Sequence, residues 1–576
     1  MRGGGLVLVR TGAKPQPRST RTIEGYTKVN PETTIFAARK ILTMNPSRPT
    51  ATHVAVRDGR IVAVGSQDEI CGSIDAEVDR RFADKVLLPG FVEGHSHIME
   101  GVVWSAPYVG AFDRRSPEGL LVKGLADIDA IIARLREAEA GMTDPETPLF
   151  AWGFDPLHIG NHKLTRQHLD RVSTTRPIMV VHASFHIGNV NSTVLERAGL
   201  TEANDISGVA IGEDGGPSGE IQGMAARFRI ERALGAAPFR ADFSAQDIDR
   251  YAASACIQGV TTITDLHNDL SEATVEVYRA ASLRPDFSVR LVPALASATH
   301  TPEQAIAKLT ALRSLSNAKL HFGIVKLVVD GSIQGFTARL RWPGYHNGAP
   351  NGLWYIAPEQ LPVIVEAYHR AGLQLHIHTN GDEATEVALD AIEAAQTAAP
   401  RPDHRHTLQH CQMADAALFR RMRALGVCVN LFSNHIFYWG DAHYELTMGP
   451  ERAGRLDATG TAQRIGVPYS IHSDAPITPL DPLFTAWCAV NRTSSGGRAL
   501  GKDSEAISVA QALAAITLGA AYTLKLDHLV GSIEAGKFAD FAVLDSDPFE
   551  VEPEKLKDIP IWGTVVGGHV RKAPRA

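Results

Sequence analysis

Leu88-Pro89-Gly90-Phe91-Val92-Glu93-Gly94-His95-Ser96-His97 is the most informative stretch of this chain. An apolar run ends in a turn, and two histidines follow with one residue between them. Side chains at positions i and i+2 of an extended strand point to the same side, so His95 and His97 can direct both imidazoles to one point. Neutral imidazole is a common ligand of zinc and related ions. The pair therefore predicts a metal site at the end of a strand.

Length and composition limit the class of protein. The chain has 576 residues, of which 44% are hydrophobic and 21% charged, as in soluble globular proteins with more than one structural unit. A net charge of -7 argues against a nucleic-acid partner, and no apolar run is long enough to span a membrane. The five cysteines show no CxxC spacing, which favours reduced thiols in a cytoplasmic protein. Residues 1–30 are expected to be a disordered extension.

From residue 86 onward, apolar strands alternate with helical stretches. The eight expected strands are 86–92, 259–265, 289–295, 323–329, 373–378, 406–410, 427–432 and 467–472. Helices are expected at 302–314, 358–371, 383–397 and 414–425. This order predicts a (β/α)8 TIM barrel over residues 88–529. An open doubly wound sheet is the rival, but no glycine-rich phosphate turn follows the first strand.

The two ends of the chain are strand-rich, and the barrel is interrupted once. Residues 31–87 include a hairpin turn at Asp58-Gly59-Arg60, and residues 530–576 hold further strands, so both ends are expected to build one small β-sandwich domain. About 160 residues separate the first two barrel strands, which predicts an inserted subdomain at about 105–250 with a strand at 177–183. Insertions at the C-terminal face of a barrel usually shape the active site.

Residues of metal-ligand type follow the barrel strands in order. His95 and His97 follow the first strand, Lys326 lies in the fourth, and His378 and His410 end the fifth and sixth. Asp474 follows the eighth strand. Because the carboxyl ends of barrel strands meet at one face, all six side chains can point into the same mouth.

These motifs carry a resemblance to a known family. The matching segments are 89–97, 325–332, 378–384, 409–410, 472–476 and 531–540. With them the chain resembles the amidohydrolase superfamily over nearly its whole length, and within it the large-insert amidohydrolase 3 group, which includes N-substituted formamide deformylase.

The resemblance implies a binuclear metal centre. His95, His97 and Asp474 would hold one divalent ion and His378 and His410 a second, with Lys326, carboxylated by CO₂, as the bridge. Zinc suits these ligands, and iron or manganese are the alternatives. The other reading of Lys326 is a buried lysine paired with Asp330, which leaves a single ion.

The expected chemistry is hydrolysis by metal-activated water. Bound ions lower the pKa of water to about 7, and Asp474 would act as general base and then acid. His186 and Asn191 match a family motif whose His and Asn face the site, and His186 can donate to a carbonyl oxygen. His435 and Trp439, which follow the seventh strand, can line a pocket, and Arg339 can bind a carboxylate. Each of these residues can also serve a purely structural role.

The sequence thus predicts a cytoplasmic metal-dependent hydrolase of non-peptide carbon–nitrogen bonds. An N-acyl or N-formyl amide is the first expected substrate, taken as a small molecule. A deaminase, or a cyclic amide or ester hydrolase, is the alternative on the same metal centre. A non-catalytic regulatory homologue is the alternative outside enzymes, and a homodimer is expected from base rates alone.

Overall fold

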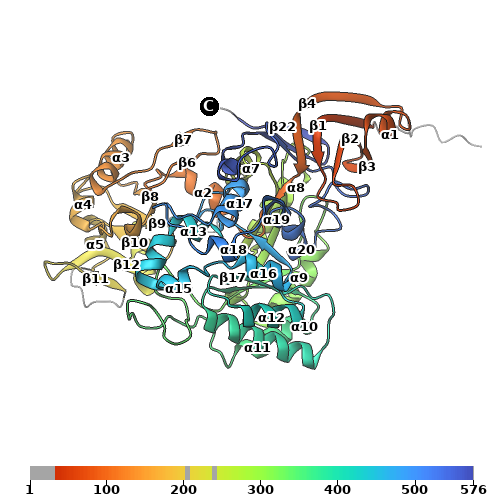
Figure 1. The fold of residues 1–576 in the computed structure, drawn as a ribbon. Helices are drawn as coiled ribbons and strands as arrows, with labels where there is room; N and C mark the ends of the chain where they lie inside the picture. Colours follow the sequence, from red (N-terminus) through yellow and green to blue (C-terminus); the bar gives the residue numbers. More distant parts are fainter. Residues whose placement is uncertain (1–32, 201–207, 223, 236–242, 575–576) are drawn as a thin grey trace, which may run out of the picture.

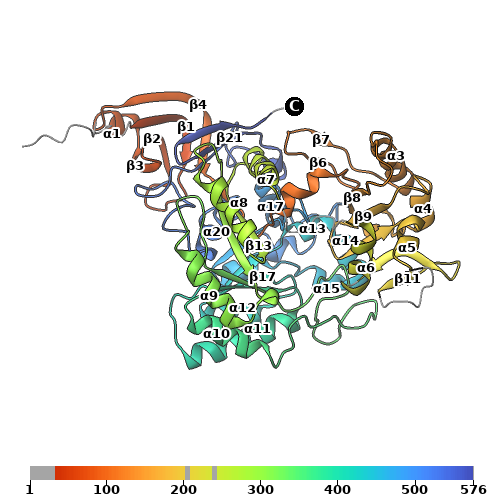
Figure 2. The same ribbon diagram turned by 180° about the vertical axis from the view of Figure 1, so that it is seen from behind.

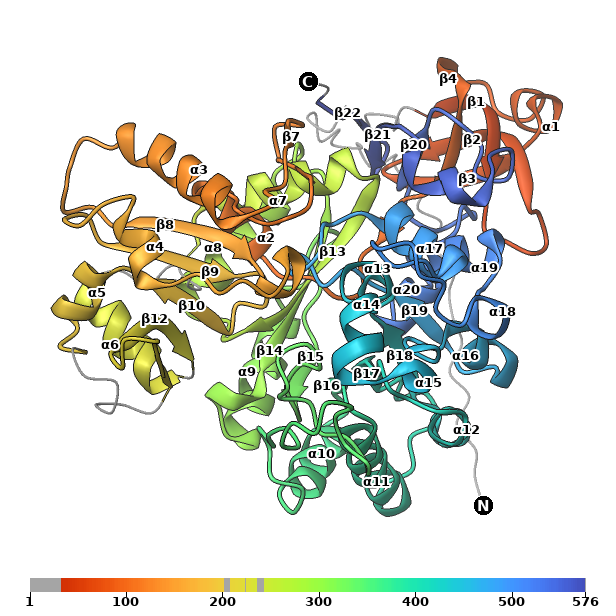
Figure 3. The same ribbon diagram turned by 60° about the vertical axis from the view of Figure 1, so that its left-hand side comes forward.

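The computed structural model describes residues 33–574 except 201–207, 223 and 236–242. The extension predicted at residues 1–30 therefore lies outside the described residues. Figures 1 and 2 show three parts from opposite sides: a central barrel, a sheet formed by both chain ends, and an insert. In Figures 1 and 3 the insert lies to the left of the barrel and the terminal sheet to its upper right. Among the described residues, no helix has the length and apolar character needed to cross a bilayer.

The central part is an eight-stranded sheet in which every neighbouring pair is parallel. Its strands are β5 (Phe91–Val92), β13 (Val260–Asn268), β14 (Arg290–Ala296), β15 (Ile324–Val328), β16 (Gln374–Thr379), β17 (Thr407–His410), β18 (Cys428–Leu431) and β19 (Tyr469–Ile471). A parallel bridge between Ser96 and Ala475 joins the segments that follow β5 and β19, so the two edges of the curled sheet meet. Seven of the eight predicted strands are confirmed, and the fold is TIM-barrel-like. The first, expected at 86–92, is corrected: residues 86–89 belong to a strand of the other, seven-stranded sheet, and only Phe91–Val92 join the barrel.

The strands form because their sequences are apolar on both faces. All seven residues of β14 are buried, as expected for parallel strands covered by helices. The covering helices include α8 (Glu272–Leu283), α9 (Pro302–Arg313), α10 (Leu361–Arg370), α11 (Asp382–Ala398), α12 (Ala416–Leu425) and α16 (Thr459–Ile465). Local signals fix their ends: Asp415 caps the first turn of α12, and Gly426 ends it at φ +70°. The four predicted helices match α9 to α12.

Both chain ends contribute to one seven-stranded sheet. Its order is β22 (His569–Lys572), β21 (Ile561–Val566), β20 (Phe541–Leu544), β4 (Glu77–Pro89), β1 (Thr34–Leu42), β2 (Thr50–Arg57) and β3 (Arg60–Gly65). The hydrogen bonds place all seven strands in a single sheet, and the two-layer sandwich stays a prediction. Arg290, at the start of β14, donates two hydrogen bonds to the Asp540 carboxylate, at 2.6 and 2.8 Å, and so joins this sheet to the barrel.

The residues between β5 and β13 have a sheet of their own. Its order is β11 (Val209–Ile211), β12 (Pro217–Gln222), β10 (Ile187–Val190), β9 (Ile178–His182) and β8 (Leu149–Phe154), and α3 (Ile128–Ala140) packs beside it. The strand expected at 177–183 is β9. Helix α7 (Ala245–Ile257) differs, because its buried Ile248, Tyr251 and Ala255 belong to the barrel core.

Candidate metal centre

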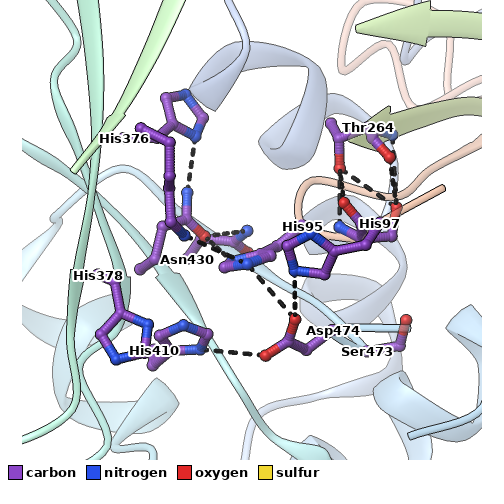
Figure 4. Close-up of polar contacts among 12 residues, drawn as sticks. His95, His97, Thr264, His376, His378, His410, Asn430, Ser473 and Asp474 are labelled. Carbon is purple, nitrogen blue, oxygen red and sulfur yellow. Dashed lines mark hydrogen bonds and ion pairs between the residues drawn. The ribbon is translucent and has the colours of Figure 1, made fainter. Parts of the chain in front are cut away.

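Ligand-type side chains from widely separated parts of the sequence surround the carboxylate of Asp474 (Figure 4). Its Oδ1 atom lies 3.1 Å from Nε2 of His97 and 3.4 Å from Nε2 of His95. Its Oδ2 atom lies 3.9 Å from Nδ1 of His410. These residues follow or end β5, β17 and β19, so the structure brings four of the six predicted ligands together at the C-terminal end of the barrel strands.

Lys326 completes this cluster from β15. Its Nζ atom lies 3.3 Å from Nε2 of His95, and burial lowers its pKa to about 7. Asp330 does not neutralise it. The Asp330 carboxylate instead accepts hydrogen bonds from the backbone N–H groups of Arg339, Asn380 and Gly381. The alternative reading, a structural Lys326–Asp330 pair, is therefore wrong.

His378, at the end of β16, lies at the margin of the cluster. Its ring centroid is 4.5 Å from that of His410. Its Nε2 atom is 3.1 Å from the carbonyl oxygen of Gly331, and it is equally far from Nδ2 of Asn380. One of its two ring nitrogens is thus already engaged by protein.

Hydrogen bonds join the backbone segments that follow the first and last barrel strands, β5 and β19. Asp474 N–H donates to the carbonyl of His95 at 3.1 Å, and His97 N–H donates to that of Ala475 at 2.9 Å. The buried carboxylate of Glu93 accepts from the backbone N–H of His95 and from both the N–H and the hydroxyl of Ser473. These contacts hold His95, His97 and Asp474 in register although nearly 380 residues separate their segments.

A second layer of polar side chains fixes the tautomer of His95. The side-chain oxygen of Gln409 lies 2.7 Å from Nδ1 of His95, and it also accepts from Asn430 at 3.0 Å. The Gln409 amide nitrogen lies 2.7 Å from Nδ1 of His376. Because an amide oxygen only accepts, Nδ1 of His95 must carry the hydrogen. The lone pair of Nε2 then faces the cluster, as metal-binding histidines require.

Two histidines near the site had not been singled out from the sequence. His472 follows β19 and is fully buried, with its ring stacked on that of His95 at 4.7 Å. His267 is near the end of β13, where the charges of His97 and Lys326, together with burial, lower its pKa to about 4. Only their position could have indicated these two histidines as site residues, since both lie at the C-terminal ends of barrel strands.

The side chains present fit a divalent metal ion. Burial lowers the pKa of His95 and His410 well below the ordinary value and that of His378 to about 3, so these imidazoles are neutral, the form that binds metal. Neither ring nitrogen of His410 or His472 has a hydrogen-bond partner within the described part of the chain. Buried polar atoms without partners are unfavourable, and a metal ion would supply what they lack.

His186 reaches the site from the insert. It directly precedes β10 and is exposed to solvent. Although part of the residue contacts solvent, the protein that crowds the imidazole lowers its pKa, as does the charge of Arg227, while the charge of Asp474 acts to raise it. The charge of His186 in turn acts to lower the pKa of His378. The insert thus brings one titratable side chain within electrostatic reach of the cluster.

Two expected substrate-binding residues have other contacts. Asn191 caps helix α5 (Ser192–Arg197): its side-chain oxygen accepts from Ile178 and Val194 N–H, and its amide nitrogen donates to two carbonyls. Arg339 donates to the Glu383 carboxylate at 3.0 Å and to a backbone carbonyl. The expectation that either faces a substrate is therefore corrected, because local hydrogen bonds already engage both side chains.

The loop after β18 is packed rather than open. Nδ1 of His435 lies 3.0 Å from Nε2 of His443, and the His435 ring contacts the ring of Trp439. Trp439 is 1% exposed, and its indole N–H donates to Asp155 of the insert at 3.0 Å. Trp439 therefore joins barrel and insert instead of lining an open pocket, and a substrate contact by His435 stays a prediction.

Known proteins with similar sequences show the family of this chain, and a solved structure shows its fold. A family model described as "Amidohydrolase family" matches residues 83–571. The chain is 26% identical to N-substituted formamide deformylase of Arthrobacter pascens over 552 residues, covering 92% of this chain and 96% of that protein. It is 26% identical to Protein LONG AFTER FAR-RED 3 of Arabidopsis thaliana over 547 residues, covering 92% and 89%. An uncharacterized metal-dependent hydrolase from Pyrococcus horikoshii OT3 has the same fold, with TM-score 0.69, 21% identity and coverage of 91% and 99%.

Proposed function

The chain belongs to the amidohydrolase family and is a hydrolase of carbon–nitrogen bonds, and from this premise we propose that it cleaves N-acyl or N-formyl amides of small molecules. The observation that carries the proposal is the convergence of His95, His97, Lys326, His410 and Asp474 at one face of the barrel. Neutral side chains with hydrogen-bond partners would serve a purely structural role better, because burying several ionisable groups together costs free energy of folding.

The metal ion would be held by His95, His97, His410 and Asp474, with Lys326 and His378 beside them. A divalent ion at such a site supplies Lewis acidity, which lowers the pKa of water and polarises a carbonyl group. Asp474 would hold a proton taken from water and pass it to the leaving nitrogen, and the position of its two oxygens among the ligand-type side chains supports this role. His186 would donate to the substrate carbonyl oxygen as negative charge develops there, and its electrostatic coupling to Asp474 supports this role.

The proposed substrate class rests on a relative and on the insert. The formamide deformylase relative acts, as its name states, on N-substituted formamides, and its similarity extends over nearly all of both chains. The insert contacts the loop after β18 through Trp439–Asp155 and through His158, whose ring nitrogen lies 3.1 Å from the Tyr438 carbonyl oxygen. These contacts support the proposal that the insert forms one wall of the substrate-binding site and that His186 lies on this wall.

The test is a substrate panel with the metal-loaded enzyme. N-substituted formamides, N-acetyl amides, cyclic amides, esters and amino-heterocycles are assayed for released acid, amine and ammonia. The same panel is run on chelator-treated protein and on Asp474→Asn, for which we expect a rate at least ~100-fold lower. Formate or acetate release that requires metal supports the proposal. Ammonia release from amino-heterocycles alone would replace it with a deaminase, and wild-type rates in D474N would remove Asp474 from the proton transfer.

A further inference from the structure

We infer that His472 is a metal ligand, so that His95, His410 and His472 form an all-imidazole triad in the metal centre. The inference rests on the proposed function only in requiring a metal ion in the barrel. His472 lies outside the six ligands that the sequence motifs indicate, and its position beside them is a property of this structure.

The first observation is that the ring nitrogens of His472 have no hydrogen-bond partner in the part of the chain that the structure describes. His472 is fully buried. Other buried histidines of this barrel differ. Both ring nitrogens of His404, His406 and His443 are hydrogen-bonded. Buried His376 has one bonded ring nitrogen and one without a partner. Among the buried histidines that the structure describes, His410 and His472 stand apart because both of their ring nitrogens lack a hydrogen-bond partner.

The second observation is geometric. One ring nitrogen each from His95, His410 and His472 lies within 4.8 Å of the others. The ring centroids of His472 lie 4.7 Å from His95 and 5.0 Å from His410. Nitrogens bound at about 2.1 Å to one ion lie at most about 4.2 Å apart. A movement that closes these distances and rotates the His472 ring out of its 18° stacking against His95 would bring all three nitrogens onto one ion.

His95 belongs both to this triad and to a second group of ligand-type residues. His95, His97 and Asp474 form a second group with ligand atoms within 4.8 Å. Since Nδ1 of His95 is engaged with Gln409, only Nε2 is free, and one nitrogen lone pair binds one ion. The two groups must then share the ion that His95 holds, and His472 joins that ion.

The ligand chemistry predicts which ions bind. Three imidazoles favour zinc and neighbouring transition ions over magnesium or calcium, which prefer oxygen ligands. Cobalt(II) is therefore a suitable probe, because its visible absorption responds to the number and type of ligands. Replacing His472 by phenylalanine keeps a ring of similar size against His95 and Phe432, whose ring stacks on that of His472 at 4.7 Å, and removes both unpartnered nitrogens.

The experiment compares full-length wild type, His472→Phe, His472→Gln and the control His443→Gln. His443 is also a buried histidine near the site, but both of its ring nitrogens are bonded to protein. Each metal-free protein is titrated with Co²⁺ and Zn²⁺, and affinity, visible spectrum and the metal-induced rise in melting temperature are recorded. We expect both His472 variants to bind about 10- to 100-fold more weakly with an altered cobalt spectrum, and H443Q to match wild type.

Wild-type affinity and spectrum in H472F would overturn the inference, as would an equal loss of affinity in H443Q. If H472F does not fold, H472Q and its melting shift decide the question in the same way. The result is independent of the substrate panel, because metal binding is read without turnover. A metal-binding protein that depends on His472 but hydrolyses no amide would reject the proposed function and keep this inference.

Discussion

The Nζ atom of Lys326 lies 3.3 Å from Nε2 of His95, and both side chains are almost completely buried. Burial lowers the pKa of Lys326 from 10.5 to about 7, so near neutral pH a large share of this lysine is the free amine. The free amine is the form that combines with CO₂, whereas an ammonium group cannot ligate a metal. The structure therefore favours carbamate chemistry at a position where an ordinary surface lysine would stay protonated.

The first prediction concerns stability and pH in metal-free, CO₂-free protein. Below about pH 7 Lys326 is protonated in both states and its burial cost is fully present. Between about pH 7 and 10.5 the unfolded chain binds one more proton than the folded chain, so this residue makes stability rise with pH, by at most about 1.4 kcal/mol per pH unit. In Lys326→Met that contribution disappears.

Urea denaturation from pH 6 to 9 measures this effect. The stability advantage of K326M over wild type should be largest at pH 6 and shrink as pH rises. Parallel curves for the two proteins would mean that Lys326 keeps an ordinary pKa.

The second prediction concerns carboxylation of the same lysine. Protein prepared with ¹³C-bicarbonate and zinc should show a carbamate carbon signal by NMR, because the neutral amine can add CO₂ with loss of a proton and bound zinc would stabilise the anionic product. The signal should be absent from K326M. A wild-type spectrum without it would leave Lys326 unmodified and favour a centre with a single ion.

The third prediction concerns Gln409. Its side-chain oxygen holds the His95 tautomer, so Gln409→Ala should weaken zinc affinity about 10- to 100-fold without changing the fold. Competition with a chromophoric chelator measures the affinity, and circular dichroism checks the fold. Gln396→Ala is a control, since Gln396 bonds only to the Arg401 backbone within helix α11 and the loop after it. Equal zinc affinity in Q409A and wild type would show that the His95 tautomer does not depend on the hydrogen bond to Gln409.

The barrel could be predicted because its parallel strands are buried on both faces and so appear as continuous apolar runs, as in β14. The cluster around Asp474 could be predicted because strand ends of a barrel share one face. The contacts of Arg339 and Asn191 could not be predicted from the sequence. Their partners, Glu383 and the backbone of Ile178 and Val194, are set by packing, and residue type alone does not show which partner engages a side chain. His472 was missed because one histidine at a strand end has no distinguishing spacing.

The fourth prediction concerns the junction between the terminal sheet and the barrel. Arg290 and Asp540 form a buried two-point ion pair, and the guanidinium lies 3.6 Å from the ring centroid of Phe538. Asp540→Ala should therefore destabilise the protein by about 3–5 kcal/mol, because it leaves a buried guanidinium without its partner. Asp286→Ala, which removes an exposed carboxylate that is one of two paired with half-buried Arg284, should cost under about 1 kcal/mol. Thermal unfolding compares the two, and similar melting temperatures would contradict the assigned role.

The last prediction tests the part that the insert plays in catalysis. If His186 donates to the developing oxyanion, His186→Ala should lower kcat about 10²- to 10³-fold on any amide that the wild type cleaves, with zinc affinity unchanged. His162→Ala is the matched control, because His162 is also an exposed histidine of the insert, whereas the electrostatic coupling to Asp474 is seen for His186. His186→Gln should recover part of the rate, since its amide can still donate. A rise in KM with unchanged kcat, or equal rates for H186A and H162A, would place His186 outside the chemical step and leave the insert to shape the pocket by contacts such as Trp439–Asp155.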